Sequence, residues 1–116
     1  MVKTLHQVSF VKERRILTSK PSVVDFSIPL LEATTTSDAQ GRYRLETIVP
    51  GPYPGRTPHV HVKVHAPGQP TLTTELYFPG ASYNSRDPYF DRRLLVRLSE
   101  VKKRFVARFD FVLRLR

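Results

Sequence analysis

Four residues that could perform chemistry fall within nine positions of this sequence: Tyr53, Arg56, His59 and His61. The two histidines alternate with valines over residues 59–65, and this period of two predicts a half-buried strand. Alternate side chains of a strand point to the same face, so the imidazoles should lie together, roughly 6.5–7 Å apart at the backbone. Two imidazoles at this spacing could bind one metal ion. The alternative is a polar strand face without a metal.

Tyr53 and Arg56 lie in a segment, residues 50–58, that is crowded with proline and glycine. This composition excludes regular helix and predicts a tight, rigid loop just before the histidine strand. A phenolate is a hard anionic donor, which suits ferric iron better than softer metals. The alternative is that Tyr53 is a capping aromatic and Arg56 a surface cation of a turn.

The elements that position these residues are predicted to be mainly strands. Residues 42–49, 59–65, 71–78 and 104–116 have β patterning, and the proline- and glycine-rich turn 66–70 predicts a hairpin between the second and third of them. Four apolar residues share a helical face and predict one short helix near residues 91–101: Leu94, Leu95, Leu98 and Val101. The expected fold is all-β, an antiparallel β-sandwich.

Three stretches resemble the intradiol ring-cleavage dioxygenases, the catechol and protocatechuate dioxygenase family: residues 37–48, 50–61 and 72–79. Residues 107–113 are similar to the last strand of that family more loosely. The resemblance implies a non-haem Fe(III) centre held by two tyrosines and two histidines. It also implies cleavage of catechol-type rings with O2 to muconate-type diacids.

The resemblance assigns roles to individual residues. His59 and His61 match the two histidine ligands, and Tyr53 matches the second tyrosine ligand, which leaves the iron when substrate chelates it. Arg56 matches the arginine that stabilises negative charge on the activated substrate, and is the expected catalytic residue.

The sequence departs from the family pattern at two places. The first tyrosine ligand should lie well upstream, but no tyrosine precedes Tyr43, which matches a position that is not a ligand. Glu75 stands where the family usually has glutamine; it could add negative charge near the iron, or face solvent. The alternative function is therefore a catalytically impaired remnant that acts as a β-sandwich binding module. A cupin-like metal site, with His65 as a third histidine, is a weaker alternative because no carboxylate follows on the same strand.

The 116 residues suit one small domain, with residues 1–36 a poorly matched amino-terminal segment and residues 37–116 the dioxygenase-like core.

The chain has no cysteine, no apolar stretch that could cross a bilayer and no secretory signal pattern, so we expect a cytoplasmic location. The net charge is +9, concentrated in residues 92–116. Aromatic residues do not interleave with these bases, so we expect no nucleic-acid partner, and no membrane partner. The expected partners are a catechol-type small molecule and O2, and unpaired strand edges favour a homo-oligomer.

Overall fold

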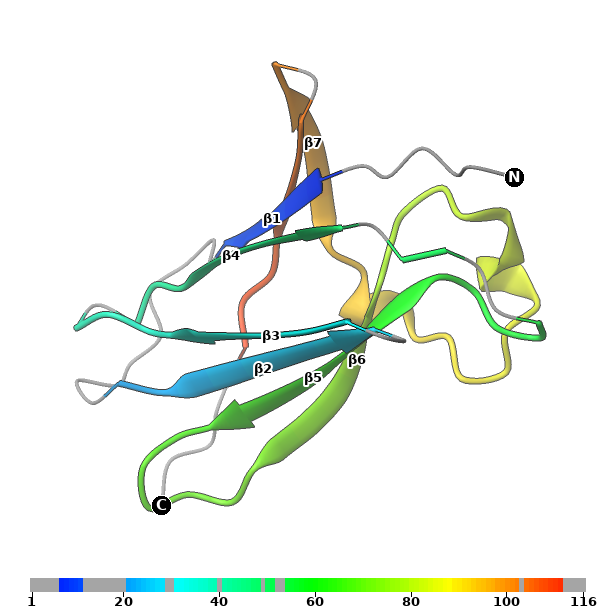
Figure 1. Ribbon diagram of the computed structural model, residues 1–116. Helices are drawn as coiled ribbons and strands as arrows, with labels where there is room; N and C mark the ends of the chain where they lie inside the picture. The colour runs from blue at the N-terminus through cyan, green and yellow to red at the C-terminus, as the bar shows by residue number, and fades with distance from the viewer. Residues whose placement is uncertain are drawn as a thin grey trace.

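A computed structural model describes residues 7–11, 21–28, 31–39, 41–48, 50–51, 54–102 and 104–111. Two four-stranded sheets pack face to face, and the fold is the β-sandwich that the sequence predicts (Figure 1). One sheet has the order β4-β1-β8-β7 and the other β3-β2-β5-β6. The elements are β1 (Gln7–Val11), β2 (Val23–Ile28), β3 (Leu31–Thr36), β4 (Arg44–Ile48), β5 (His59–His65), β6 (Leu72–Tyr77), the 3-10 helices η1 (Ser82–Ser85) and η2 (Arg92–Leu94), β7 (Arg97–Val101) and β8 (Arg104–Arg108).

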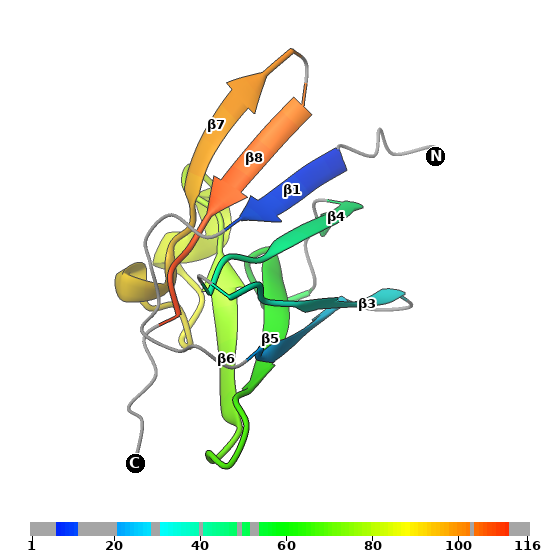
Figure 2. The ribbon, with the colours of Figure 1, turned by 90° about the vertical axis from the view of Figure 1, so that its left-hand side faces the viewer.

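Among the named strands, pairing is antiparallel except between β1 and β8, which run parallel. Figure 2 shows the two sheets from the side, with β7, β8, β1 and β4 above the second sheet. The first 36 residues contribute to both sheets: β1 belongs to the first sheet, and β2 and β3 belong to the second.

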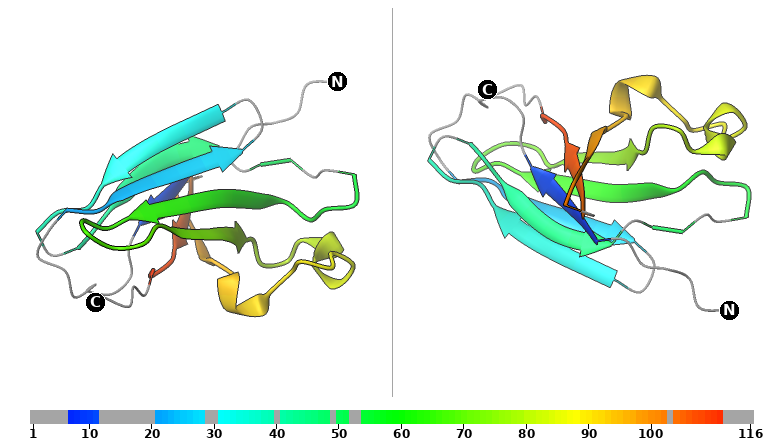
Figure 3. Two further views of the ribbon diagram at one scale, coloured as in Figure 1. Left: turned by 90° about the horizontal axis from the view of Figure 1, so that it is seen from below. Right: turned by 90° about the horizontal axis from the view of Figure 1, so that it is seen from above.

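Strand β5 lies in the interior of its sheet, between β2 and β6 (Figure 3). Its two faces differ in chemistry. Val60, Val62 and Val64 are buried toward the other sheet, whereas the alternate residues of the strand face outward. Burying a side chain of this size contributes roughly 1.5–3 kcal/mol. The inward face of β5 is therefore a main part of the core, which also contains Val24, Phe26, Tyr43, Leu45, Leu76, Phe78, Val96, Ala107 and Phe111.

The hairpin predicted between β5 and β6 is confirmed, and it brings specific residues of the two strands opposite each other. His59 pairs with Tyr77, and His61 with Glu75. The loop that precedes β5 and the segment that follows β6 lie at the same end of the sheet (Figure 1). Residues from both segments can therefore meet beside His59.

The short helix predicted near residues 91–101 is wrong for most of its length. Only the 3-10 turn η2 forms there, and residues 97–101 form β7, which pairs with β8. Leu98 fits a helical face, but buried Val96 and half-buried Leu98 also alternate with exposed residues, which is a strand pattern. The backbone N–H of Val96 donates to the Tyr77 carbonyl oxygen at 2.9 Å, and β8 offers a full ladder of partners. Tertiary pairing overrides the local helical spacing here.

Within the part of the chain that the structure describes, no helix has the length and apolar character that a bilayer crossing requires.

Candidate metal centre

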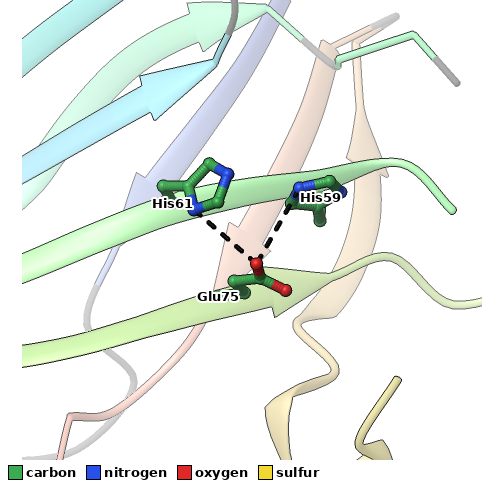
Figure 4. Close-up of side chains that lie close together, drawn as sticks. All are labelled: His59, His61 and Glu75. Carbon is green, nitrogen blue, oxygen red and sulfur yellow. Dashed lines mark ion pairs between the residues drawn. The ribbon is translucent and has the colours of Figure 1, made fainter. Parts of the chain in front are cut away.

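His59 and His61 lie side by side on the outer face of β5, as their spacing predicts (Figure 4). Their ring centroids are 4.9 Å apart and their planes cross at 78°. His59 is buried, with only 8% of its surface exposed, whereas His61 is exposed. The two imidazoles therefore present one buried and one accessible nitrogen donor to the same region.

The tautomer of His59 follows from its hydrogen bond. Its Nδ1 lies 2.8 Å from the carbonyl oxygen of Thr57, which can only accept, so Nδ1 carries the proton. In the neutral ring, Nε2 then holds a lone pair directed away from Thr57. This arrangement, one nitrogen fixed by a backbone carbonyl and the other free to bind, is common in histidines that ligate metals.

Glu75 of β6 faces both histidines (Figure 4). Its Oε1 lies 3.7 Å from His61 Nδ1 and 4.0 Å from His59 Nε2. One donor atom from each of the three residues can be chosen so that all lie within 4.8 Å of one another. Glu75 does not face solvent: it lies at the centre of the candidate site, and its side chain is 23% exposed.

The other oxygen of the Glu75 carboxylate is held by two donors. Its Oε2 accepts from Arg56 Nη2 at 2.7 Å and from the Tyr77 hydroxyl at 2.5 Å. Burial disfavours the charge on Glu75, but these hydrogen bonds outweigh it and lower the pKa of the carboxyl below its ordinary value. The same burial and the carboxylate together raise the pKa of Tyr77, which stays a neutral donor.

Arg56 lies between two carboxylates. Its Nε donates to Asp87 Oδ2 at 2.8 Å, and Nη2 donates to Glu75. Burial alone would lower the pKa of Arg56, but the hydrogen bonds to Glu75 and Asp87 raise it, so the guanidinium remains charged. Its Cζ lies 4.8 Å from the centroid of the Tyr89 ring, a cation–π contact.

Asp87 anchors this arrangement from the loop after β6. Its side chain is fully buried, and it accepts from Arg56, from the Thr57 N–H at 2.9 Å and from the Tyr89 N–H at 2.8 Å. Burial raises its pKa, but the hydrogen bonds from Arg56 and the two backbone amides have the larger combined effect and lower it. One buried carboxylate thus ties the segment before β5 to the segment after β6.

The structure brings together three of the residues that carry the expected chemistry, His59, His61 and Arg56, with Glu75 as their common neighbour. Tyr53, the expected phenolate ligand, lies outside the described residues. His65 is directed elsewhere: its Nε2 lies 2.8 Å from Asp25 Oδ2, so it pairs with a carboxylate of β2.

Tyr43 lies in the core and away from the candidate site. Its hydroxyl donates to the Phe109 carbonyl, and its ring is buried, in keeping with a position that is not a ligand.

Next to His61, a groove of about 450 Å³ runs over the outer face of the sheet. Its lining includes Asp25, Ser27, Glu32, Thr34, Lys63 and Thr73.

The donor set fits a metal ion. Two imidazoles and a carboxylate suit a divalent or ferric transition metal, whereas all-oxygen sites suit Mg²⁺ and Ca²⁺. Ligands about 2.0–2.2 Å from one ion lie roughly 3.0–3.6 Å apart at the usual angles. The observed separations of 3.7 and 4.0 Å are slightly wider. Small side-chain movements would therefore bring these atoms to bonding distance.

Comparison with known proteins identifies the family. The dioxygenase family model matches residues 18–115. The dioxygenase domain of a dioxygenase–carbohydrate-binding protein fusion from Streptomyces sp. SirexAA-E is 34% identical, with a TM-score of 0.84, over 96% of this chain and 81% of that domain. The chain belongs to the intradiol ring-cleavage dioxygenase family.

More distant structures share the fold. Chlorocatechol 1,2-dioxygenase from Pseudomonas putida is 22% identical, with a TM-score of 0.78, over 93% of this chain. An intradiol ring-cleavage dioxygenase from Tetranychus urticae is 16% identical, with a TM-score of 0.72, over 91% of this chain and 79% of that one. The chain spans 60% of the length of the Pseudomonas putida enzyme and 53% of a catechol 1,2-dioxygenase from Acinetobacter.

Proposed function

We propose that this chain is a non-haem Fe(III) intradiol dioxygenase that cleaves catechol-type rings with O2 to muconate-type diacids. One observation carries the proposal: in a chain of this family, the imidazoles of His59 and His61 converge on the carboxylate that also binds Arg56. His59, His61 and Tyr53 would hold the ferric ion. When bound, iron supplies the electronic coupling between the aromatic ring and O2.

Three other residues of the chain would stabilise the charge on the substrate or position the groups that do so. Arg56 is a permanent cation, and its Nη1 has no hydrogen-bond partner among the residues that the structure describes. A fixed cation in a partly dry site stabilises negative charge that develops on a bound catecholate. Asp87 positions that cation, and the Thr57 carbonyl holds the proton of His59 on Nδ1.

The groove next to His61 offers space for a small aromatic substrate. Its volume of about 450 Å³ lies within the range of roughly 300–1,000 Å³ that is usual for small-molecule sites. The exposure of His61 leaves this side of the histidine pair open to the groove. A ring bound there would approach the proposed iron ligands from the outer face of β5.

The test is the visible absorption spectrum of the purified protein with ferric iron, before and after catechol is added. We expect a tyrosinate-to-iron charge-transfer band that shifts on addition of catechol, followed by formation of the diacid under O2. Tyr53→Phe should lose the band, and His61→Ala should lose the iron, while both variants keep the circular dichroism of the parent. A protein that stays colourless and free of iron would refute the proposal and favour the binding-module alternative.

A further inference from the structure

We propose that Glu75 is itself a metal ligand, through Oε1, and completes the set to which His59 and His61 belong. This inference rests on the two histidine ligands of the proposed function, but it requires neither Tyr53 nor ring cleavage. The resemblance places Glu75 where the family usually has glutamine, so the ligand would be a feature of this chain.

The geometry of the carboxylate supports this role because its two oxygens have different surroundings. Oε2 is engaged by Arg56 and by the Tyr77 hydroxyl. Oε1 faces the two imidazoles, too far from either for a hydrogen bond, at 3.7 and 4.0 Å. One oxygen is therefore fixed by the protein while the other is directed at the nitrogen donors, as in metal sites whose ligating carboxylates are oriented by outer hydrogen bonds.

Strand register makes the arrangement rigid. Glu75 is the direct cross-strand partner of His61, and His59 lies two residues away on the same face. Directly opposed residues of antiparallel strands have Cβ atoms about 4.5–5.5 Å apart. The three donors thus come from the two strands of one hairpin, and no loop rearrangement is needed to assemble them.

The charge of the set supports the same conclusion. The resemblance implies two anionic tyrosine ligands, and this sequence offers only Tyr53 at a matching position. A carboxylate from Glu75 would restore the second anionic oxygen. Glutamine could not do so, because Arg56 and Tyr77 would hold its carbonyl oxygen and leave its NH2 group, which has no lone pair to donate, facing the histidines.

The experiment measures metal affinity, with Co²⁺ as the probe, because its visible bands report binding without enzymatic turnover. The wild-type protein, Glu75→Gln and Glu100→Gln are titrated with Co²⁺ by absorption and by calorimetry. Glu100→Gln is the matched control: it also removes one negative charge, but exposed Glu100 lies on β7 of the other sheet and outside the groove lining. We expect Glu75→Gln to weaken Co²⁺ binding at least about 10-fold and Glu100→Gln to change it less than about threefold.

The outcomes separate the two proposals. Equal Co²⁺ affinity of Glu75→Gln and wild type would overturn the role of Glu75 and leave the histidine ligands and the proposed function standing. Equal weakening by Glu100→Gln would also overturn it, because a general charge effect would then explain the loss. No Co²⁺ binding by the wild-type protein would overturn the ligand set and the proposed function together.

A second measurement does not depend on how well a variant folds. In a crystal structure of the wild-type protein with Co²⁺, we expect Glu75 Oε1 about 2.0–2.2 Å from the ion. A distance well beyond bonding range, with both histidines bound, would overturn the inference. Glu75→Gln makes the bonds from Arg56 and Tyr77 neutral and weaker, so we expect the metal-free variant to unfold at a somewhat lower temperature than the wild type. A circular dichroism spectrum that matches the wild type at the temperature of the titration would show that lost affinity does not come from lost fold.

Discussion

Replacing Asp87 by Asn tests whether one buried carboxylate holds the loop after β6 against the segment before β5. Asn keeps the size and shape of the side chain but removes its charge. In the wild-type protein, Oδ2 accepts from Arg56 Nε and the Thr57 N–H, and Oδ1 accepts from the Tyr89 N–H. An amide can place its carbonyl oxygen on only one of these two sides.

The loss in the free energy of unfolding caused by Asp87→Asn follows from the three hydrogen bonds that Asp87 accepts. The best orientation keeps the carbonyl oxygen toward Arg56 and Thr57 and turns the NH2 group toward the Tyr89 N–H, so one bond to a charged acceptor is lost. Such a bond contributes about 1.5–3 kcal/mol, and the two that remain become neutral and weaker. We therefore expect the free energy of unfolding to fall by about 3 kcal/mol at pH 7.

The deficit should depend on pH in a defined direction. The folded-state pKa of Asp87 is lower than its ordinary value of 3.8. The charge of Asp87 therefore stabilises the fold fully above about pH 4–5, and this contribution is lost as the pH falls below 3.8 toward the folded-state pKa. Asn does not titrate, so the gap between the two proteins should narrow in acid.

Urea denaturation of both proteins at pH 7 and at pH 3, followed by circular dichroism, measures this gap. With urea slopes of about 1–3 kcal/mol per molar for small domains, the loss corresponds to a midpoint lower by about 1–3 M at pH 7. Equal midpoints at pH 7 would refute the role assigned to Asp87. A gap that stays the same at pH 3 would refute the electrostatic explanation.

Three other substitutions test separate parts of the structure. Leu76→Ala, at a fully buried core position, should cost about 2–5 kcal/mol in urea denaturation, and a loss below 1 kcal/mol would contradict the core assignment. Tyr43→Phe removes the bond to the Phe109 carbonyl and should cost about 1 kcal/mol while leaving iron colour unchanged, and loss of colour would make Tyr43 a ligand after all. His65→Gln should cost less than about 1 kcal/mol and leave iron content unchanged, because His65 pairs with half-exposed Asp25; reduced iron would revive a third-histidine site.

Much of the fold could be predicted because local pattern and tertiary role agree in β5 and β6. The valine–histidine alternation in β5 marks a strand with one apolar face, and the turn after it contains Gly68 at a φ of +70°, which glycine adopts without strain. The shared face of His59 and His61 follows from the same alternation. These features depend only on neighbouring residues, which a single sequence displays directly.

Other features could not be predicted, because they depend on contacts between distant residues. Arg56 and Asp87 are 31 positions apart, and nothing local marks Asp87 as the buried partner of a site arginine. The inward orientation of Glu75 depends on the register with His61. Likewise, the leucine spacing around Leu98 suits a helix or a strand, and only pairing with β8 decides between them.

The two faces of β5 make assembly of the candidate centre inseparable from formation of the hydrophobic core. Because strand side chains alternate with a period of two, a slip of one residue in its pairing would move the histidines inward and expel the valines to solvent. Misregistered chains would thus lose the imidazole pair and their main apolar contacts at once. Selection for a stable core therefore also maintains the alignment of the candidate metal ligands, because a one-residue slip cannot keep the core contacts and lose only the histidine pair.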